Sequence, residues 1–86
     1  MKILKYGSRG SLVELLQTAL NRAGHGALDV DGSYGAQTRQ AVFSLQRAAG
    51  IAPIGEARSA VWRALEPYTG AQTVHTLRQR ETLPDV

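Results

Sequence analysis

The sequence predicts an all-α fold: a small three-helix bundle with glycine turns and an internal duplication of a turn-helix unit. Two stretches of the chain place apolar residues at helical spacing, and each stretch follows a glycine-rich turn. The length of 86 residues, 43% of them hydrophobic, provides for one core and not for two. We therefore expect three helices joined by turns, with little or no sheet.

The first helix is expected over residues 11–23. Ser11 and Glu14 have the spacing of a capping box, and Gly24 is a typical residue just after a helix. The apolar positions that repeat at helical spacing are Leu12, Val13, Leu15, Leu16, Ala19, Leu20 and Ala23. They define the side of this helix that faces the expected core.

The second helix is expected over residues 36–49, directly after a tight turn. In this turn Gly32 and Gly35 permit a positive φ or a close backbone approach, and Asp31 can accept hydrogen bonds from the turn's own amides. Gly50 is the expected stop. The inward positions are Thr38, Ala41, Val42, Leu45 and Ala48.

A third, short helix is expected to end before Pro67. Pro53 and Gly55 break the segment after the second helix, and Ser59 can cap the next one. The apolar residues of this helix are Val61, Trp62 and Leu65. We expect the folded domain to occupy residues 1–67.

The turn and the helix that follows it recur along the chain. The pattern G-x-x-G-x-x-[V/T] describes residues 7–13 and 32–38, and a weaker copy without the second glycine covers residues 55–61. An offset of 29 residues aligns Val13 with Val42, Leu16 with Leu45, Gln17 with Gln46, and Ala19 with Ala48. This indicates an internal duplication. Because two or three copies are too few for a solenoid, the units are expected to pack together in one core.

Three motifs follow one another in a fixed order between residues 4 and 66. They are G-x-x-G-x-x-V-x-x-L-Q-x-x-L from Gly7, D-G-x-Y-G-x-x-T-x-x-A-V-x-x-L-Q-x-x-x-G from Asp31, and Gly55 followed by Trp62-x-x-Leu65. As a set they resemble the small peptidoglycan-binding domain that is attached to many bacterial cell-wall hydrolases. That family usually has an aromatic residue in place of Leu45, a polar residue in place of Ile54, and Thr before the Trp, so the third turn departs most from its pattern.

The resemblance implies a non-catalytic module that binds peptidoglycan and targets a linked hydrolase to the wall. Aromatic rings, amides and guanidinium groups suit a ligand that carries sugar faces and carboxylates. The candidate ligand-binding residues are Tyr34, Gln37, Arg39, Phe43 and Arg47, and the candidate structural-turn residues are Gly7, Gly10, Asp31, Gly32, Gly35 and Gly55. No cofactor is implied.

Phe43 is the most distinctive of these candidates. Arg39 and Arg47 flank it at i−4 and i+4, which predicts an exposed aromatic ring between two cations, unless the C-terminal tail covers it. For Tyr34 and Trp62 the default interpretation is packing in the core of so small a domain. The paired glutamines at positions 17 and 46 could likewise be buried amides that hold turn backbone.

Catalytic and metal chemistry have little support in the sequence. Cysteine is absent, which excludes disulfides and thiolate chemistry, and His25 and His75 lack the spacing of metal ligands. Asp29 and Asp31 lie two residues apart around a turn, where capping explains them better than acid-base catalysis. No nucleophile motif occurs. We therefore expect this chain to be no enzyme itself, and to be part of a longer hydrolase or wall-binding protein.

The expected partners are peptidoglycan and a linked catalytic or lysin-motif domain. Residues 68–86 are interpreted as a linker or the start of a following domain, because residues 75–86 faintly resemble the opening of a lysin motif. No apolar run approaches about 18 residues, so no membrane partner is expected. The first motif begins almost at once, so no signal peptide is visible. Location in the cell wall or outside the cell is implied by the resemblance alone.

Nucleic-acid binding is the alternative from another functional class. The net charge of +3 and short helices permit a helix-turn-helix domain, in which Gln37, Gln40, Ser44 and Arg47 could read bases. The connection over residues 24–35 is much longer than the three or four residues typical of that motif. Nucleic acid is therefore an unlikely partner.

Overall fold

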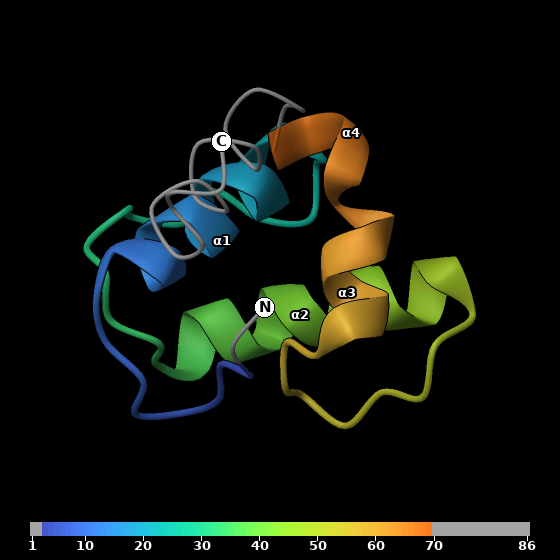
Figure 1. Ribbon diagram of the computed structural model, residues 1–86, viewed down its shortest axis with the longest axis horizontal. Helices are drawn as coiled ribbons and strands as arrows, with labels where there is room; N and C mark the ends of the chain where they lie inside the picture. The colour runs from blue at the N-terminus through green and yellow to red at the C-terminus, as the bar shows by residue number, and fades with distance from the viewer. Residues whose placement is uncertain (1–2, 70–86) are drawn as a thin grey trace, which may run out of the picture.

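The computed structural model describes residues 3–69. This part of the chain contains no strand and four helices, which are α1 (Ser11–Arg22), α2 (Ala36–Ala49), α3 (Ser59–Ala64) and α4 (Glu66–Thr69). In Figure 1, α3 stands on α2 and leads into α4, and α4 packs against α1. Helices α1 and α2 also contact each other, which closes the group around one core. The all-α prediction is confirmed.

The single third helix of the prediction is divided in two. Helix α3 ends at Ala64 with Leu65 as its C-cap, and α4 begins at the next residue. Pro67 does not follow the last helix but lies in the first turn of α4, where its missing N–H costs nothing. The helical body therefore extends past residue 67, and Thr69 is buried. The division into residues 1–67 and 68–86 stays a prediction, and the faint lysin motif lies outside the described residues.

The two long helices begin and end close to the predicted residues. Helix α1 ends at Arg22, one residue earlier than expected, and α2 has the predicted bounds of 36–49. Gly50 ends α2 in the left-handed conformation with a φ of 72°.

The predicted side-chain caps are wrong. Gly10 is the N-cap of α1, so Ser11 is already helical, and no side chain caps this end. Arg58 takes the N-cap position of α3 in place of Ser59, again without a side-chain bond. In α1 the carbonyl of Gly10 accepts the amides of Val13 and Glu14, so the backbone supplies the first bonds.

The core lies where the helices meet. Its buried apolar residues are Leu4, Val13, Leu16, Ala19, Leu20, Tyr34, Ala41, Val42, Leu45, Ala57, Val61, Trp62 and Leu65. Most of these are predicted inward positions. Trp62 lies in the core, as the sequence analysis expected. Ala48 is the exception, because it is exposed in the last turn of α2, which extends beyond α3 in Figure 1.

The three glycine turns are joined through their backbones. Leu4 forms an isolated antiparallel bridge with Ala57, and Arg9 forms another with Ser33. The amide of Gly10 donates to the carbonyl of Gly32 at 2.9 Å. Turns that are far apart in the sequence therefore lie side by side.

The two glutamines of the duplicated unit, Gln17 and Gln46, form equivalent hydrogen bonds. The side-chain oxygen of Gln17 accepts the amide of Gly32 at 3.0 Å, and that of Gln46 accepts the amide of Gly55 at the same distance. Both glycines have positive φ, 73° and 77°. The interpretation of these glutamines as buried amides that hold turn backbone is confirmed.

Candidate ligand-binding face

Phe43 lies between the two arginines predicted to flank it. The guanidinium carbon of Arg39 is 5.3 Å from the ring centroid, and that of Arg47 is 5.9 Å away. Both distances are within the range of cation–π attraction. The ring is half-buried, however, and not fully exposed as the sequence suggested.

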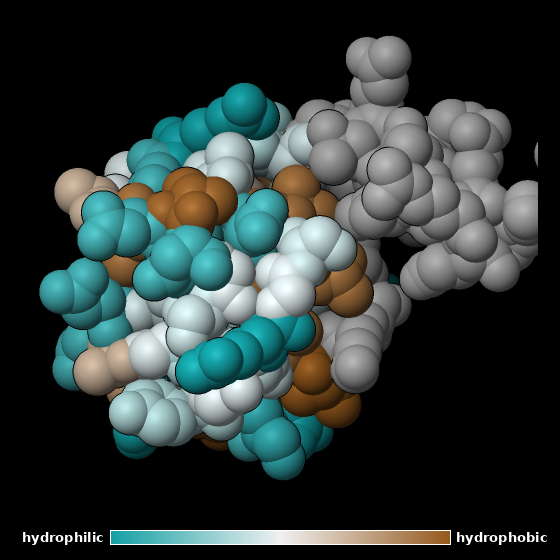
Figure 2. Space-filling view, turned by 90° about the vertical axis from the view of Figure 1, so that its left-hand side faces the viewer, coloured by the Kyte–Doolittle hydropathy of each residue, from teal (hydrophilic) through white to brown (hydrophobic). Residues whose placement is uncertain are grey.

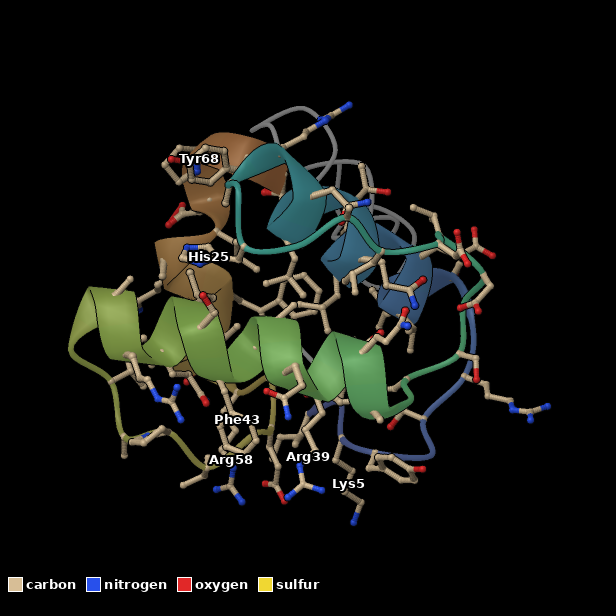
Figure 3. All side chains as sticks on the ribbon, turned by 180° about the vertical axis from the view of Figure 1, so that it is seen from behind. Lys5, His25, Arg39, Phe43, Arg58 and Tyr68 are labelled. Atoms are coloured by element: carbon tan, nitrogen blue, oxygen red, sulfur yellow. The ribbon has the colours of Figure 1, made fainter. Side chains whose placement is uncertain are left out.

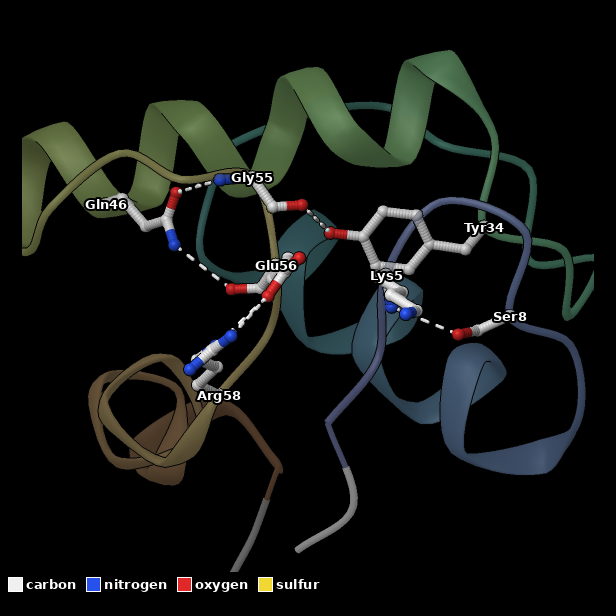
Figure 4. Close-up of polar contacts among 7 residues, drawn as sticks. All are labelled: Lys5, Ser8, Tyr34, Gln46, Gly55, Glu56 and Arg58. Carbon is white, nitrogen blue, oxygen red and sulfur yellow. Dashed lines mark hydrogen bonds and ion pairs between the residues drawn. The ribbon is translucent and has the colours of Figure 1, made fainter.

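The part of the ring that is covered packs on the third turn. A Cβ placed on Gly55 would lie 3.0 Å from Cζ of Phe43, so only a glycine fits under the ring at this φ. The side-chain oxygen of Gln46 accepts the amide of Gly55, and the hydroxyl of Tyr34 donates to the carbonyl of Gly55 at 2.7 Å (Figure 4). Buried polar contacts on both sides of Gly55 thus support the ring from below.

Two further cations reach the same side of the molecule. The antiparallel bridge between Leu4 and Ala57 places the first and third turns side by side, so that Lys5 lies opposite Glu56 and Arg58 follows Ala57 on the neighbouring segment. In Figure 3 Lys5 and Arg58 extend from the same edge as Arg39 and Phe43. Arg58 is paired with Glu56 at 2.8 Å. We call this surface the Phe43 face; its residues are Lys5, Arg39, Phe43, Arg47 and Arg58.

Tyr34 is buried and does not reach the surface of this face. Its side chain is 1% exposed, and its hydroxyl is occupied by the carbonyl of Gly55. Burial, assisted by the nearby charge of Glu56, raises the pKa of Tyr34 to about 12. The default interpretation of Tyr34 as a core residue is confirmed, and its role as a ligand contact stays a prediction.

Gln37 is exposed but lies on another side of α2. It lines two adjoining surface hollows of about 230 and 330 Å³ that Leu28 also lines. Gln37 therefore does not join the Phe43 face. Figure 2 shows a mainly hydrophilic side of the molecule on which apolar residues form separate patches.

The second turn is built around Asp31 and Gly32. Oδ1 of Asp31 accepts hydrogen bonds from Nε2 of Gln17 at 3.0 Å and from the amide of Ser33 at 2.9 Å. These bonds lower the pKa of Asp31, the one from Gln17 most. A Cβ on Gly32 would lie 3.2 Å from the carbonyl oxygen of Gly10.

Gly35 has neither the positive φ nor the close backbone approach that the sequence suggested for this turn. Its φ of −109° is open to any residue, and a Cβ there would meet nothing within 4 Å. It is the N-cap of α2, a position with extended backbone. Gly7 and Gly10, in contrast, have positive φ of 97° and 127°.

No group of three or more His, Asp or Glu side chains in residues 3–69 could hold a metal ion. Nδ1 of His25 is 3.0 Å from Oγ of Ser44, a contact between the α1–α2 connection and α2. His75 lies outside the described residues. None of the helices in the described part of the chain is long and apolar enough to cross a membrane.

Comparison with known proteins decides the family. Residues 9–65 match the family described as "Putative peptidoglycan binding domain", and this range includes α1, α2 and α3. The chain belongs to this peptidoglycan-binding family. The resemblance seen in the sequence motifs is thereby confirmed. The α1–α2 connection, residues 23–35, is much longer than that of a helix-turn-helix.

Relatives of this peptidoglycan-binding domain occur within cell-wall hydrolases. A "Probable N-acetylmuramoyl-L-alanine amidase" of Bacillus licheniformis is 53% identical over 51 residues, which are 57% of this chain and 14% of the amidase. The crystal structure of the Burkholderia AP3 phage endolysin matches with a TM-score of 0.73 and 40% identity, over 76% of this chain and 25% of the endolysin chain.

A third relative is almost wholly matched. The crystal structure of the SleB N-terminal domain has a TM-score of 0.75 and 28% identity, and the match covers 80% of this chain and 94% of that domain. The peptidoglycan-binding domain thus spans a small part of the amidase and the endolysin and nearly the whole of the SleB domain.

Sequence reasoning missed two residues of the Phe43 face in this peptidoglycan-binding domain. Lys5 and Arg58 come from the first and third turns, and the backbone bridge between Leu4 and Ala57 brings these two turns to the same edge of the molecule. Helical spacing revealed Arg39 and Arg47, since both lie on the same helix as Phe43. No local signal would have revealed the other two cations.

Proposed function

We propose that this peptidoglycan-binding domain is a non-catalytic module that targets a linked hydrolase to the bacterial cell wall, and that the Phe43 face contacts peptidoglycan. The observation that carries the proposal is the family match, which extends over residues 9–65 and so over most of the described helical body. The relatives in an amidase and an endolysin support the linkage to a hydrolase.

Such a module acts by raising the local concentration of the linked hydrolase at its substrate. A hydrolase tethered to a wall-bound domain meets its substrate at an effective concentration set by the linker, so a weak contact is sufficient. The repetitive wall offers many equivalent sites, which favours rebinding. The proposed location of the whole protein is the cell wall or the outside of the cell.

The Phe43 face has the groups that such a ligand requires. The accessible part of the Phe43 ring can pack on a sugar face, while Arg39 and Arg47 offer charged N–H donors beside it. The support from Gly55 keeps the ring in place before the ligand arrives. Little ordering of side chains is then needed on binding.

Co-sedimentation of the chain with purified sacculi tests the proposed function. We expect the chain to pellet with sacculi and to release no soluble muropeptides. Release of muropeptides would contradict the non-catalytic assignment. Tight, salt-sensitive binding to duplex DNA without retention on sacculi would favour a nucleic-acid-binding function instead.

A further inference from the structure

We propose that Arg39 and Arg47 bind free carboxylates of the peptidoglycan stem peptides, with both guanidinium groups held in place on the ring of Phe43. The proposal rests on the proposed function, because it names the part of peptidoglycan that the Phe43 face recognises. It assigns the selectivity of this face to charge and not to the sugar surface.

The donors of both arginines are available. Within residues 3–69 neither guanidinium group forms a hydrogen bond or an ion pair with another side chain. Glu56, the acid nearest to this face along the third turn, is already bound by Arg58 through Nε at 3.0 Å and NH2 at 2.8 Å. The acid beside the face therefore does not compete with a ligand for the two arginines.

Contact with the ring of Phe43 leaves both guanidinium groups able to bind a carboxylate. A guanidinium that lies against an aromatic ring retains outward N–H donors, whose planar arrangement matches the two oxygens of a carboxylate. Because Arg39 and Arg47 converge on one ring, their like charges repel each other. A bound carboxylate would relieve that repulsion.

The ring itself is fixed. The backbone of Gly55 lies under Phe43, with its amide bound to Gln46 and its carbonyl bound to Tyr34. Both of these side chains are about 1% exposed, so the support is buried and rigid. The two arginines are thus organised before binding, which lowers the entropy that binding costs.

The distribution of charge favours an anion at this face. Lys5 adds a third cation at the same edge (Figure 3), and within residues 3–69 it forms no ion pair. Asp29 and Asp31 belong to the second turn, and Glu14 packs against Gly32 of that turn. Glu56 lies beside the Phe43 face, but Arg58 pairs with it, so the remaining positive charge of the face attracts carboxylates.

The test compares two preparations of sacculi, both stripped of phosphate-containing wall polymers with hydrofluoric acid. One keeps its carboxylates, and in the other they are amidated with methylamine and a carbodiimide. We expect the chain to bind the amidated sacculi about tenfold or more weakly, since charge-assisted hydrogen bonds are lost. The Arg39→Gln/Arg47→Gln variant is expected to bind both preparations equally and weakly.

Arg9→Gln is the matched control, because Arg9 is an exposed arginine of the first turn outside the Phe43 face. It should keep the full preference for unmodified sacculi. Thermal melting of each variant confirms that it is folded.

The outcomes separate this proposal from the proposed function. Equal binding of the unmodified chain to both preparations would overturn the carboxylate proposal and leave peptidoglycan binding in place. A double variant that keeps the full preference would overturn it too, since another face would then hold the carboxylate. A chain that binds untreated sacculi but neither of the stripped preparations would overturn the carboxylate proposal and identify the phosphate polymers as the partner. Failure to bind any sacculi would overturn the proposed function.

Discussion

Gln17 and Gln46 show how one buried side chain can determine the shape of a turn. Each lies on the inner side of a long helix and accepts the amide of a glycine with positive φ. Nε2 of Gln17 also donates to Asp31, Ser33 and Thr38. A buried amide must satisfy its donors and acceptor, and the turn backbone provides the partners. This explains why Gln recurs at equivalent positions of the duplication.

Gly32 and Gly35 of the second turn differ in backbone conformation, and therefore in whether a side chain is tolerated. Gly32→Ala should lower the free energy of unfolding by about 1 kcal/mol or more, because its φ is 73° and the new Cβ would crowd the carbonyl of Gly10. Gly35→Ala is the matched control and should be tolerated, since its φ is −109° with open space around it. Urea unfolding measures both. Equal losses in the two variants would contradict this account.

Asp31 makes the stability of the domain sensitive to acid. Its pKa is lowered in the folded state by the hydrogen bond from Gln17 and the amide of Ser33. A lowered folded pKa gives a stabilisation that is present above the unfolded value of 3.8 and is lost as the pH falls through the folded pKa. Urea unfolding of the chain and of Asp31→Asn between pH 2 and pH 6 should therefore show a difference that shrinks at the acidic end. A difference independent of pH would rule out this origin.

At the scale of the element, two sides of helix α2 have different roles. One side places Val42 and Leu45 in the core, and the other presents Arg39, Phe43 and Arg47. The last turn extends beyond α3, which explains why Ala48 is exposed although its position is inward by helical spacing. A helical repeat predicts which side is inward, while the length of the neighbouring helices decides how far the core extends.

The two aromatic residues of this region should differ in their effect on stability. Trp62→Ala should cost roughly 3 to 5 kcal/mol and unfold much of the domain, since Trp62 is 6% exposed. Phe43→Ala should cost only about 1 kcal/mol because its ring is half-buried, and it should weaken binding to sacculi. Calorimetry and co-sedimentation measure the two effects. A folded Trp62→Ala variant that fails to bind would move the binding face to α3.

At the scale of the described residues 3–69, helix α4 joins the end of the chain to its beginning. Helix α4 packs on α1, Thr69 is 1% exposed, and the carbonyl of Tyr68 accepts a hydrogen bond from Arg22 at 3.4 Å. The contact joins the end of the described chain to its first helix, although the two lie more than 40 residues apart. Local sequence does not reveal such a contact.

Truncation tests where the folded unit ends. A chain that stops at residue 67 loses Tyr68 and Thr69 and should melt at a lower temperature than a chain that stops at residue 69. Identical melting of the two truncations would support the predicted boundary at residue 67.

Local patterns were sufficient to predict the all-α class, the bounds of α2, the near bounds of α1, and the pairing of Arg39 and Arg47 with Phe43. Each of these depends on residues within a few turns of one helix, where spacing along the chain is also spacing in the molecule. The duplication was visible for the same reason, because it repeats a local unit.

The assembly of the turns was decided only by the folded chain. The burial of Tyr34, the place of Gly55 under Phe43, and the presence of Lys5 and Arg58 at one edge all depend on contacts between distant segments. Gly35 resembled Gly32 in sequence, yet its backbone is ordinary because it begins a helix. Buried polar groups can be satisfied by partners anywhere in the chain, so their partners follow from the packing of the whole molecule and not from the sequence around them.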